Sequence, residues 1–367
     1  MNSLSFRGLA LASGTLSLAL LAAAPATAQG DGEWSFSSNA RFRAEFNDNA
    51  PGTKDRHRQR LRLRFGANYR FNSELLVGAR VTTGNPDDPR NPYVDLGDGF
   101  NSEDITLDRL FFQYTPETVP GLAVVGGKFG PPVYRNPIYG NLVWDEDVQP
   151  EGLGAIYSRS DFMGFDEFHV TAGQLAALEQ AAGENAWATL VEIGGYIHAG
   201  DDATFSGAAA YFFYGDLTPS ASAALAADLR GNALTGSELT SDYGILDVNL
   251  AYENEDVIFS GEFIQNQRAD SSVGDTGFAV GAALKTETGK FYYQYASIEQ
   301  DAILTTYSND DMIMATNFNN HMAGWKTPLS DQVDLHIWIM AQEPNEILAG
   351  VIDEMVYRIR FDVTLHM

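Results

Sequence analysis

The chain has 367 residues, a formal net charge of -26 at neutral pH and no cysteine. An acidic chain lacks the basic footprint of a nucleic-acid-binding protein, and the absence of thiols excludes disulfides, zinc–thiolate sites and cysteine nucleophiles. The 35 Gly, 16 Tyr and 22 Phe favour many short strands over long helices.

The N-terminus has the pattern of a secretory signal peptide over residues 1–28. Arg7 gives a positive start, 9–24 form an apolar stretch, and Ala26-Thr27-Ala28 is an A-x-A cleavage site, so the mature chain would begin at Gln29. A membrane anchor is the alternative, but small polar residues interrupt the run. No later apolar run approaches the about 20 residues of a spanning helix.

The rest of the chain, 29–367, shows no domain boundary and is predicted to be one domain. Its dominant pattern alternates with a period of two, which predicts strands. Trp34 and Phe42 share one parity, whereas Arg41 and Arg43 share the other. The pattern predicts about sixteen strands, and we place them at 33–46, 58–71, 74–83, 105–115, 121–129, 152–160, 167–174, 187–199, 203–214, 244–253, 256–267, 277–287, 290–299, 319–327, 332–342 and 354–366.

The connections between these strands alternate in length. The long ones include 47–57, 84–104, 130–151, 175–186, 215–243 and 300–318. The short ones are 72–73, 116–120, 161–166, 200–202, 254–255, 288–289 and 328–331. Long outer loops and short periplasmic turns are typical of a transmembrane antiparallel β-barrel, which pairs every backbone group in lipid. We therefore predict an all-β barrel of about 16 strands in the outer membrane.

Five arginines of one parity, Arg56 to Arg64, would point to one side of a strand. A lipid-facing charge costs about 2–4 kcal/mol near the midplane, so this ladder should face a lumen. Neighbouring strands add further inward basic residues. The predicted pore-lining basic residues are Arg41, Arg43, Arg58, Arg60, Arg62, Arg64, Arg80, Arg109, Lys128, Arg358 and Arg360.

The opposite arc offers inward carboxylates. They are Glu192, Asp247, Glu253, Glu262 and Asp334. A basic arc facing an acidic arc would give a transverse field across the lumen. The alternative is that these charges pair with each other across the wall.

The third long connection, 129–152, is rich in proline and aromatic residues. Long loops with their own apolar residues are often functional. We expect this loop to fold inward and narrow the lumen, with Asp145, Glu146, Asp147 and Glu151 facing the arginine ladder. Packing over the barrel mouth or at a subunit contact is the alternative.

Two other kinds of site find little support. The second long connection clusters Asp87, Asp88, Asp95 and Asp98, but their spacing does not match a helix-loop-helix calcium site. No metal site is predicted, and no cofactor. The chain also lacks an H-E-x-x-H pair, a nucleophile elbow and a glycine-rich phosphate cradle, so we do not expect an enzyme.

Several stretches resemble the putative porin family of Gram-negative outer membranes. They are R-Q-R-L-R-L-R-F-G (58–66), G-A-R-V-T-T-G-N-P-D-D-P-R-N-P (78–92), L-G-D-G-F (96–100), G-G-K-F-G-P-P (126–132), L-V-W-D-E-D-V-Q-P-E-G (142–152) and R-I-R-F-D-V (358–363). The resemblance is dense over 33–160 and implies a barrel, an outer-membrane location and solute diffusion. One departure is the C-terminal Met367, where such barrels commonly end in an aromatic residue.

Two functions follow as hypotheses. The first is a porin for passive diffusion of small polar solutes or ions, with outer-membrane lipids around it and, by analogy alone, a homotrimeric assembly. The second is a structural or adhesive barrel whose lumen is plugged by its loops. Deletion of 133–145 is expected to enlarge conductance in the first case only.

Overall fold

The structure is a computed structural model. It describes residues 32–50, 55–97, 99, 101–181, 183, 185–200, 202–217, 225, 231–346 and 354–367. The predicted signal peptide lies outside the described residues. In the described part no helix is long and apolar enough to cross a membrane.

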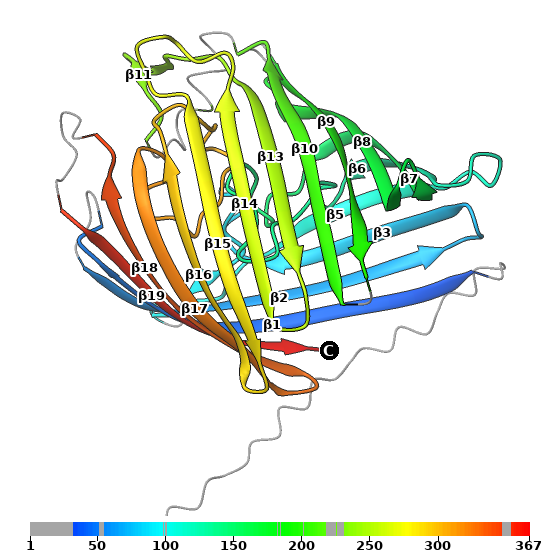
Figure 1. The fold of residues 1–367 in the computed structure, drawn as a ribbon, viewed down its shortest axis with the longest axis horizontal. Coiled ribbons are helices and arrows are strands. Elements are labelled where there is room, and N and C mark those ends of the chain that lie inside the picture. The colour runs from blue at the N-terminus through cyan, green and yellow to red at the C-terminus, as the bar shows by residue number, and fades with distance from the viewer. Residues whose placement is uncertain are drawn as a thin grey trace, which may run out of the picture. The chain divides into compact units, whose positions relative to one another are not determined.

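Sixteen long antiparallel strands form one closed barrel (Figure 1). They are β1 (Glu33–Asp48), β2 (Arg56–Arg70), β3 (Leu75–Thr83), β5 (Ile105–Tyr114), β6 (Leu122–Lys128), β7 (Glu151–Phe162), β8 (Phe165–Leu178), β9 (Ala186–Ala199), β10 (Ala203–Gly215), β13 (Gly244–Glu253), β14 (Val257–Asn266), β15 (Thr276–Thr286), β16 (Gly289–Ile298), β17 (Phe318–Ser330), β18 (Val333–Pro344) and β19 (Val356–His366). The barrel closes because β1 pairs with β2 on one side and with β19 on the other.

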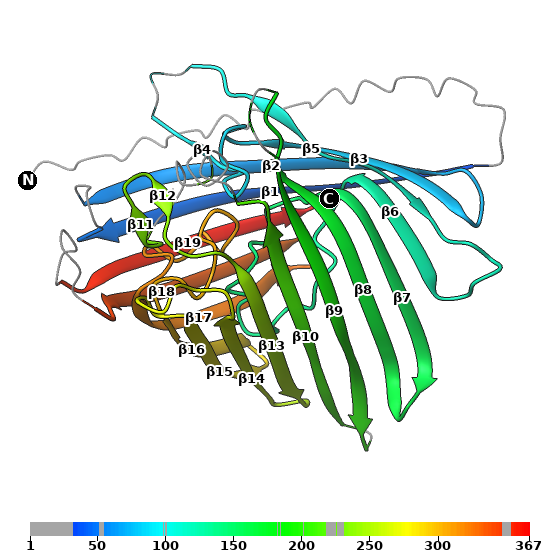
Figure 2. The ribbon, with the colours of Figure 1, turned by 90° about the horizontal axis from the view of Figure 1, so that it is seen from above.

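Each of the sixteen predicted strands is confirmed, and so is the alternation of long loops and short turns. The largest difference in length is at β8, where the predicted 167–174 extends to Phe165–Leu178. Three two-residue strands lie in the long loops: β4 (Val94–Asp95), β11 (Leu234–Thr235) and β12 (Glu238–Leu239). Figure 2 shows the long loops gathered at one end of the barrel.

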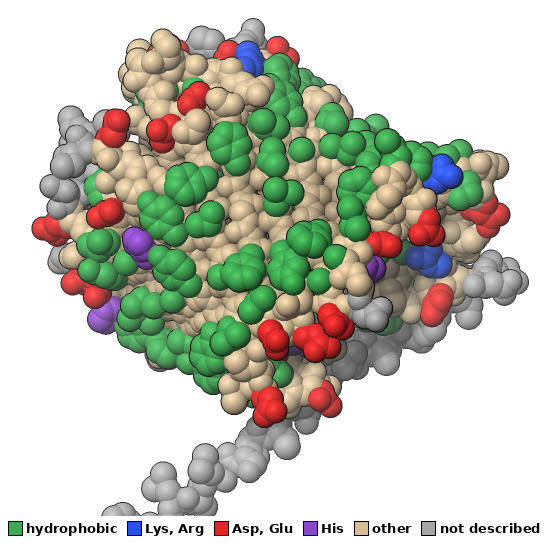
Figure 3. All heavy atoms as spheres, in the orientation of Figure 1, with side chains coloured by type: hydrophobic (Ala, Val, Ile, Leu, Met, Phe, Trp, Pro, Cys, Tyr) green, Lys and Arg blue, Asp and Glu red, His purple; other side chains and the backbone are tan. Residues whose placement is uncertain are grey.

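The two faces of the barrel wall are inverted relative to a soluble sandwich. On β2 the apolar Leu61, Leu63 and Phe65 are exposed, whereas the alternating Arg60, Arg62 and Arg64 are buried. Apolar side chains accordingly cover much of the outer surface in Figure 3. A charged inner face and an apolar outer face are what a strand needs when lipid surrounds it.

Part of the barrel interior is filled rather than open. Two long connections line it: loop 3 (129–150, between β6 and β7) and loop 7 (299–317, between β16 and β17). Trp144 of loop 3 stacks between Phe212 of β10 and Tyr307 of loop 7, with ring centroids 5.9 and 5.5 Å away. These groups belong to a buried apolar cluster that continues through Leu142 and Ile264. The inward faces of β9 to β18 therefore carry a hydrophobic core, which the alternating pattern did not predict.

Candidate functional site

Strands β19, β1 and β2 bring eight inward arginines together, and we call this group the arginine wall. Its members are Arg41, Arg43, Arg58, Arg60, Arg62, Arg64, Arg358 and Arg360. The register places Arg43 opposite Arg60, and Arg41 opposite Arg62. Directly paired residues have Cβ atoms about 4.5–5.5 Å apart, so without counter-ions these cations would repel strongly.

Glu45 of β1 lies at the centre of the wall and is fully buried. Its carboxylate accepts from Arg360 and from Arg58, the latter at 2.6 Å, and Arg60 and Arg358 lie 3.9 and 4.0 Å away. One carboxylate thus serves four guanidiniums from all three strands, including both sides of the barrel closure.

Other buried or half-buried carboxylates serve further guanidiniums of the wall. Asp362 accepts two bonds from Arg43, at 2.7 and 2.9 Å. Asp311 of loop 7 accepts from Arg360, and Asp108 of β5 lies 3.9 Å from Arg64. Including Glu45, Asp95 and Asp147, six carboxylates surround the eight arginines.

Asp95 reaches the wall because β4 pairs with the long-loop end of β2. Its carboxylate lies 2.7, 3.0 and 2.8 Å from Arg56, Arg58 and Arg60. Asp88, from the same predicted acidic cluster, pairs with Arg90 at 3.1 Å. The described residues form no group of three or more metal-ligating side chains, and Asp98 lies outside them. Asp88 and Asp95 are therefore ion-pair partners.

Tyr93, just before β4, is a site residue that sequence reasoning missed. Its ring lies under the guanidiniums of Arg43, Arg60 and Arg62, at 4.3, 4.8 and 5.5 Å from the centroid. Arg41 donates to its hydroxyl at 2.9 Å. A ring face attracts cations, so Tyr93 separates and holds the guanidiniums where carboxylates are few. An aromatic residue beside Asp95 was the only signal in the sequence.

The predicted carboxylates of loop 3 differ in what they contact. Asp147 faces the arginine wall, with its oxygens 2.7 Å from Arg64 and 3.7 Å from Arg62. Glu146 instead pairs with Arg135 of the same loop at 3.2 Å. Glu151 starts β7 and pairs with Lys128 at 2.6 Å. Asp147 is thus the one predicted loop carboxylate with an ion pair to the wall, within the described residues.

Asp145 is buried away from the wall and accepts backbone N–H bonds from Asp147 and Asp310, at 2.7 and 2.8 Å. Burial, reinforced by the carboxylates of Asp310 and Asp147, raises the pKa of Asp145 well above its ordinary value. Burial also acts to raise the pKa of Asp147, but Arg64 and Arg62 outweigh it and lower that pKa. The pKa values of two carboxylates only two residues apart are therefore shifted in opposite directions.

Two carboxylates of the acidic arc hold loop 3. Glu192 accepts from the backbone N–H of Tyr134, at 3.0 and 2.9 Å to its two oxygens. Glu262 accepts from the N–H of Leu142 at 3.0 Å. Asp247 is buried beside Asn249, which donates to it at 2.9 Å.

The two remaining arc carboxylates pair with lysines. Glu253 lies 2.6 Å from Lys285, and Asp334 lies 3.7 Å from Lys326. These partners are not among the predicted basic residues, so within the described residues no ion pair joins the predicted basic arc to the predicted acidic arc. The other predicted basic residues are also engaged: Arg80 with Asp108, and Arg109 with Gln149 at 2.6 Å.

Loop 7 contributes residues that the sequence did not single out. Arg358 donates to the carbonyl oxygen of Asp311 at 2.5 Å, and Tyr139 of loop 3 donates to the Asp311 carboxylate at 2.7 Å. Asp311 therefore joins the wall to loop 3. Loop 7 carries a run of carboxylates (Asp310, Asp311), but nothing in its composition indicates that it turns inward.

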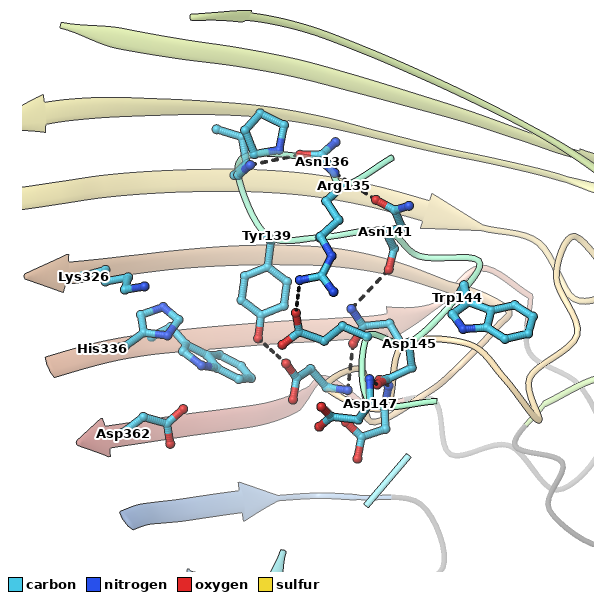
Figure 4. A pocket seen from close by; sticks show the side chains of 18 of the residues that line it. Arg135, Asn136, Tyr139, Asn141, Trp144, Asp145, Asp147, Lys326, His336 and Asp362 are labelled. Carbon is cyan, nitrogen blue, oxygen red and sulfur yellow. Dashed lines mark hydrogen bonds and ion pairs between the residues drawn. The ribbon is translucent and has the colours of Figure 1, made fainter. Parts of the chain in front are cut away.

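A cavity of about 300 Å³ remains between loop 3 and the barrel wall (Figure 4). In Figure 4 Lys326, His336 and Asp362 lie on one side of it, and Asp145 and Asp147 lie on the other. Arg41, Arg43 and Tyr93 also line it. Basic strands and an acidic loop thus enclose a polar space inside the barrel.

A closed barrel of sixteen strands, apolar outside and charged inside, defines an outer-membrane porin by class. The family model described as "Putative porin" matches residues 28–229, which is more than half of the chain. The chain belongs to this putative porin family and is an outer-membrane β-barrel porin.

Solved porins share the fold at low sequence identity. OprB of Pseudomonas putida superposes with a TM-score of 0.59 at 12% identity, covering 91% of this chain and 93% of that one. OmpF of Salmonella typhi, solved with daunomycin, gives 0.57 at 10% identity, covering 91% and 97%. A mutant Rhodopseudomonas blastica porin gives 0.52 at 10% identity, covering 91% and 100%. No curated protein sequence matches the chain significantly.

Proposed function

We propose that this porin lets small hydrophilic solutes or ions diffuse passively through a water-filled pore that loop 3 narrows. The observation that supports this most is the cavity of about 300 Å³ between loop 3 and the inner wall. Its charged lining includes solvated groups, since the side chains of Lys326, Arg135 and Glu146 are 52, 58 and 62% exposed. Solvated charges of both signs favour water and polar solutes over an apolar ligand.

A single-cysteine experiment tests this proposal. Because the chain has no cysteine, a thiol introduced by Glu146→Cys is the one target for a charged methanethiosulfonate reagent. We expect purified wild-type protein to give ohmic conductance in planar bilayers. The Glu146→Cys variant should conduct as well and lose conductance stepwise when the reagent is added.

Thr118→Cys is the matched control, because Thr118 is exposed in the short turn between β5 and β6, away from the cavity. Its modification should leave conductance unchanged. A well-folded wild type that does not conduct would refute the diffusion proposal. Equal block in both variants would refute the position assigned to loop 3.

A plugged structural or adhesive barrel is the second candidate, supported by the apolar cluster that loops 3 and 7 build inside the barrel. It predicts no ohmic conductance, so the same recordings decide between the two. Deletion of 133–145 is a poorer test, because it removes Leu142 and Trp144 from that cluster.

The remaining parts of the proposal concern partners. We propose outer-membrane lipids around the apolar face, small polar solutes or ions in the lumen and a homotrimer as the assembly, with no cofactor and no catalytic activity. Chemical cross-linking in detergent should give a trimer band, and a monomer band alone would contradict that assembly.

A further inference from the structure

Apart from Arg41, each guanidinium of the arginine wall lies close to a carboxylate. Arg60, Arg62 and Arg360 are 2, 4 and 1% exposed, and each lies beside at least one carboxylate. Charges that are buried and paired act weakly on an ion in water, because the field of each cation is offset by its partner. Selectivity must therefore come from charges that remain solvated in the cavity.

The strand register aligns a row of mostly basic side chains along the inner wall, which we call the basic row. Consecutive pairings join Lys285 to Lys290, Lys290 to Lys326, and Lys326 to His336. The row continues from His336 to Asp362 and from Asp362 to Arg43. It thus crosses five strand boundaries with one carboxylate among six side chains.

The basic row runs from the short-turn end of the barrel toward the long-loop end. Lys285 and Lys290 flank the short turn between β15 and β16, at the periplasmic end. Arg43 is ten residues into β1, and its partner Arg60 lies near the long-loop end of β2. Each step between strands covers about 4.8 Å, so the row leads along the wall from one side of the cavity toward the other.

Two cations at the cavity have no close carboxylate, and a third has only one long ion pair. Lys290 donates to the carbonyl oxygen of Pro137 at 3.0 Å, and Arg41 donates to Thr364 and Tyr93, both at 2.9 Å. Neither has a carboxylate within 4.0 Å in the described part of the chain. Lys326 is half exposed, and its nearest carboxylate, Asp334, is 3.7 Å away. All three line the cavity.

The carboxylates across the cavity are compensated except for Asp310, which lines the cavity without an ion pair among the described residues. Asp147 is held by Arg64 and Asp311 by Arg360, while Glu146 pairs with Arg135. Asp145 is buried and accepts two backbone N–H groups. The solvated excess at the cavity is therefore positive, although the chain as a whole is strongly acidic.

We propose that the pore is selective for small anions, and that Lys290, Lys326 and Arg41 form the cationic site that attracts them. This inference rests on the diffusion function proposed above. The negative net charge of the whole chain has less influence at this cationic site, because charges beyond about 8 Å are screened at physiological salt. Within the basic row, Lys285, Lys290 and Lys326 then offer an anion consecutive cationic neighbours along the wall.

Reversal potentials in a potassium chloride gradient test the inference. We expect the wild type to favour chloride over potassium, and the double variant Lys290→Gln/Lys326→Gln to lower the chloride-to-potassium permeability ratio by about two- to fivefold for each lysine. Lys128→Gln is the matched control, since it removes one positive charge that is already paired with Glu151. It should leave the ratio unchanged.

The outcomes separate this inference from the function on which it rests. If the wild type conducts but favours potassium, the proposed anion selectivity is refuted. Equal reversal potentials in the wild type and the double variant also refute it. Neither outcome contradicts the porin function. An equal shift in Lys128→Gln would assign selectivity to total charge and would also refute the proposed cationic site. No conductance from any folded variant would instead refute diffusion itself.

Discussion

The arginine wall and the hydrophobic core on the inward faces of β9 to β18 fill the interior of the same barrel by different means. In the wall, Glu45 is fully buried among four guanidiniums from three strands. In the hydrophobic core, Ile264 and Leu142 are buried in an apolar cluster with loop 3. One side is held by charge pairing and the other by the hydrophobic effect, with the cavity between them.

This difference has an energetic consequence. Removing one member of a buried ion network leaves uncompensated charge, whereas removing part of an apolar core leaves a cavity. The wall should therefore be the side more sensitive to a single substitution, and the loop side should tolerate small changes in shape.

Glu45→Ala gives the largest expected loss of stability. It leaves four buried or half-buried guanidiniums without their shared partner, so we expect about 3–5 kcal/mol to be lost from the free energy of unfolding. Urea titration in lipid vesicles measures this loss. Glu33→Ala on the exposed start of the same strand should change stability little. Equal stability of Glu45→Ala and wild type would contradict the network.

Leu142→Ala tests the apolar side and should have the next largest effect. Leu142 is 2% exposed, and truncating a buried leucine costs about 2–5 kcal/mol, depending on how well the site collapses. We expect a value near the lower end, because loop 3 can adjust against the cavity. Leu234→Ala, in the exposed hairpin of β11 and β12, is the control. A larger loss for Leu142→Ala than for Glu45→Ala would reverse the comparison.

The smallest effect is a pH dependence that separates Asp145 from Asp147. The folded state binds the Asp145 proton more tightly than the unfolded chain does, so this group adds stability as pH falls through its raised pKa. Asp147, whose pKa is lowered, adds stability above the ordinary value of about 3.9 and loses it as pH falls further.

Urea titrations of wild type, Asp145→Asn and Asp147→Asn measure the effect, from neutral pH down to below the ordinary aspartate pKa of about 3.9. The stability of wild type relative to Asp145→Asn should grow as pH falls, and that relative to Asp147→Asn should shrink. Parallel pH profiles would show that the two carboxylates have the same surroundings.

The strands could be predicted because lipid imposes a strict alternation on every one of them, and β2 illustrates this with its arginines and leucines. Glu45 and Asp362 could also be placed beside the arginines, since they share the inward parity of their strands. The path of loop 7 and the approach of Tyr93 could not, because they depend on pairing across the closed barrel. The basic row was missed for the same reason: Lys290 and Lys326 are 36 residues apart, and only the register makes them neighbours.

The short strand β4 has a consequence for the edge of the sheet. β2 pairs with β3 only from Arg64 to Arg70, so its long-loop half lacks a partner on that side. Val94 pairs with Leu61, and the N–H of Leu96 donates to the Gln59 carbonyl at 2.8 Å. An unpaired strand edge is a template on which a foreign strand can add. By covering it, the second loop occupies backbone groups of β2 that an added strand would need.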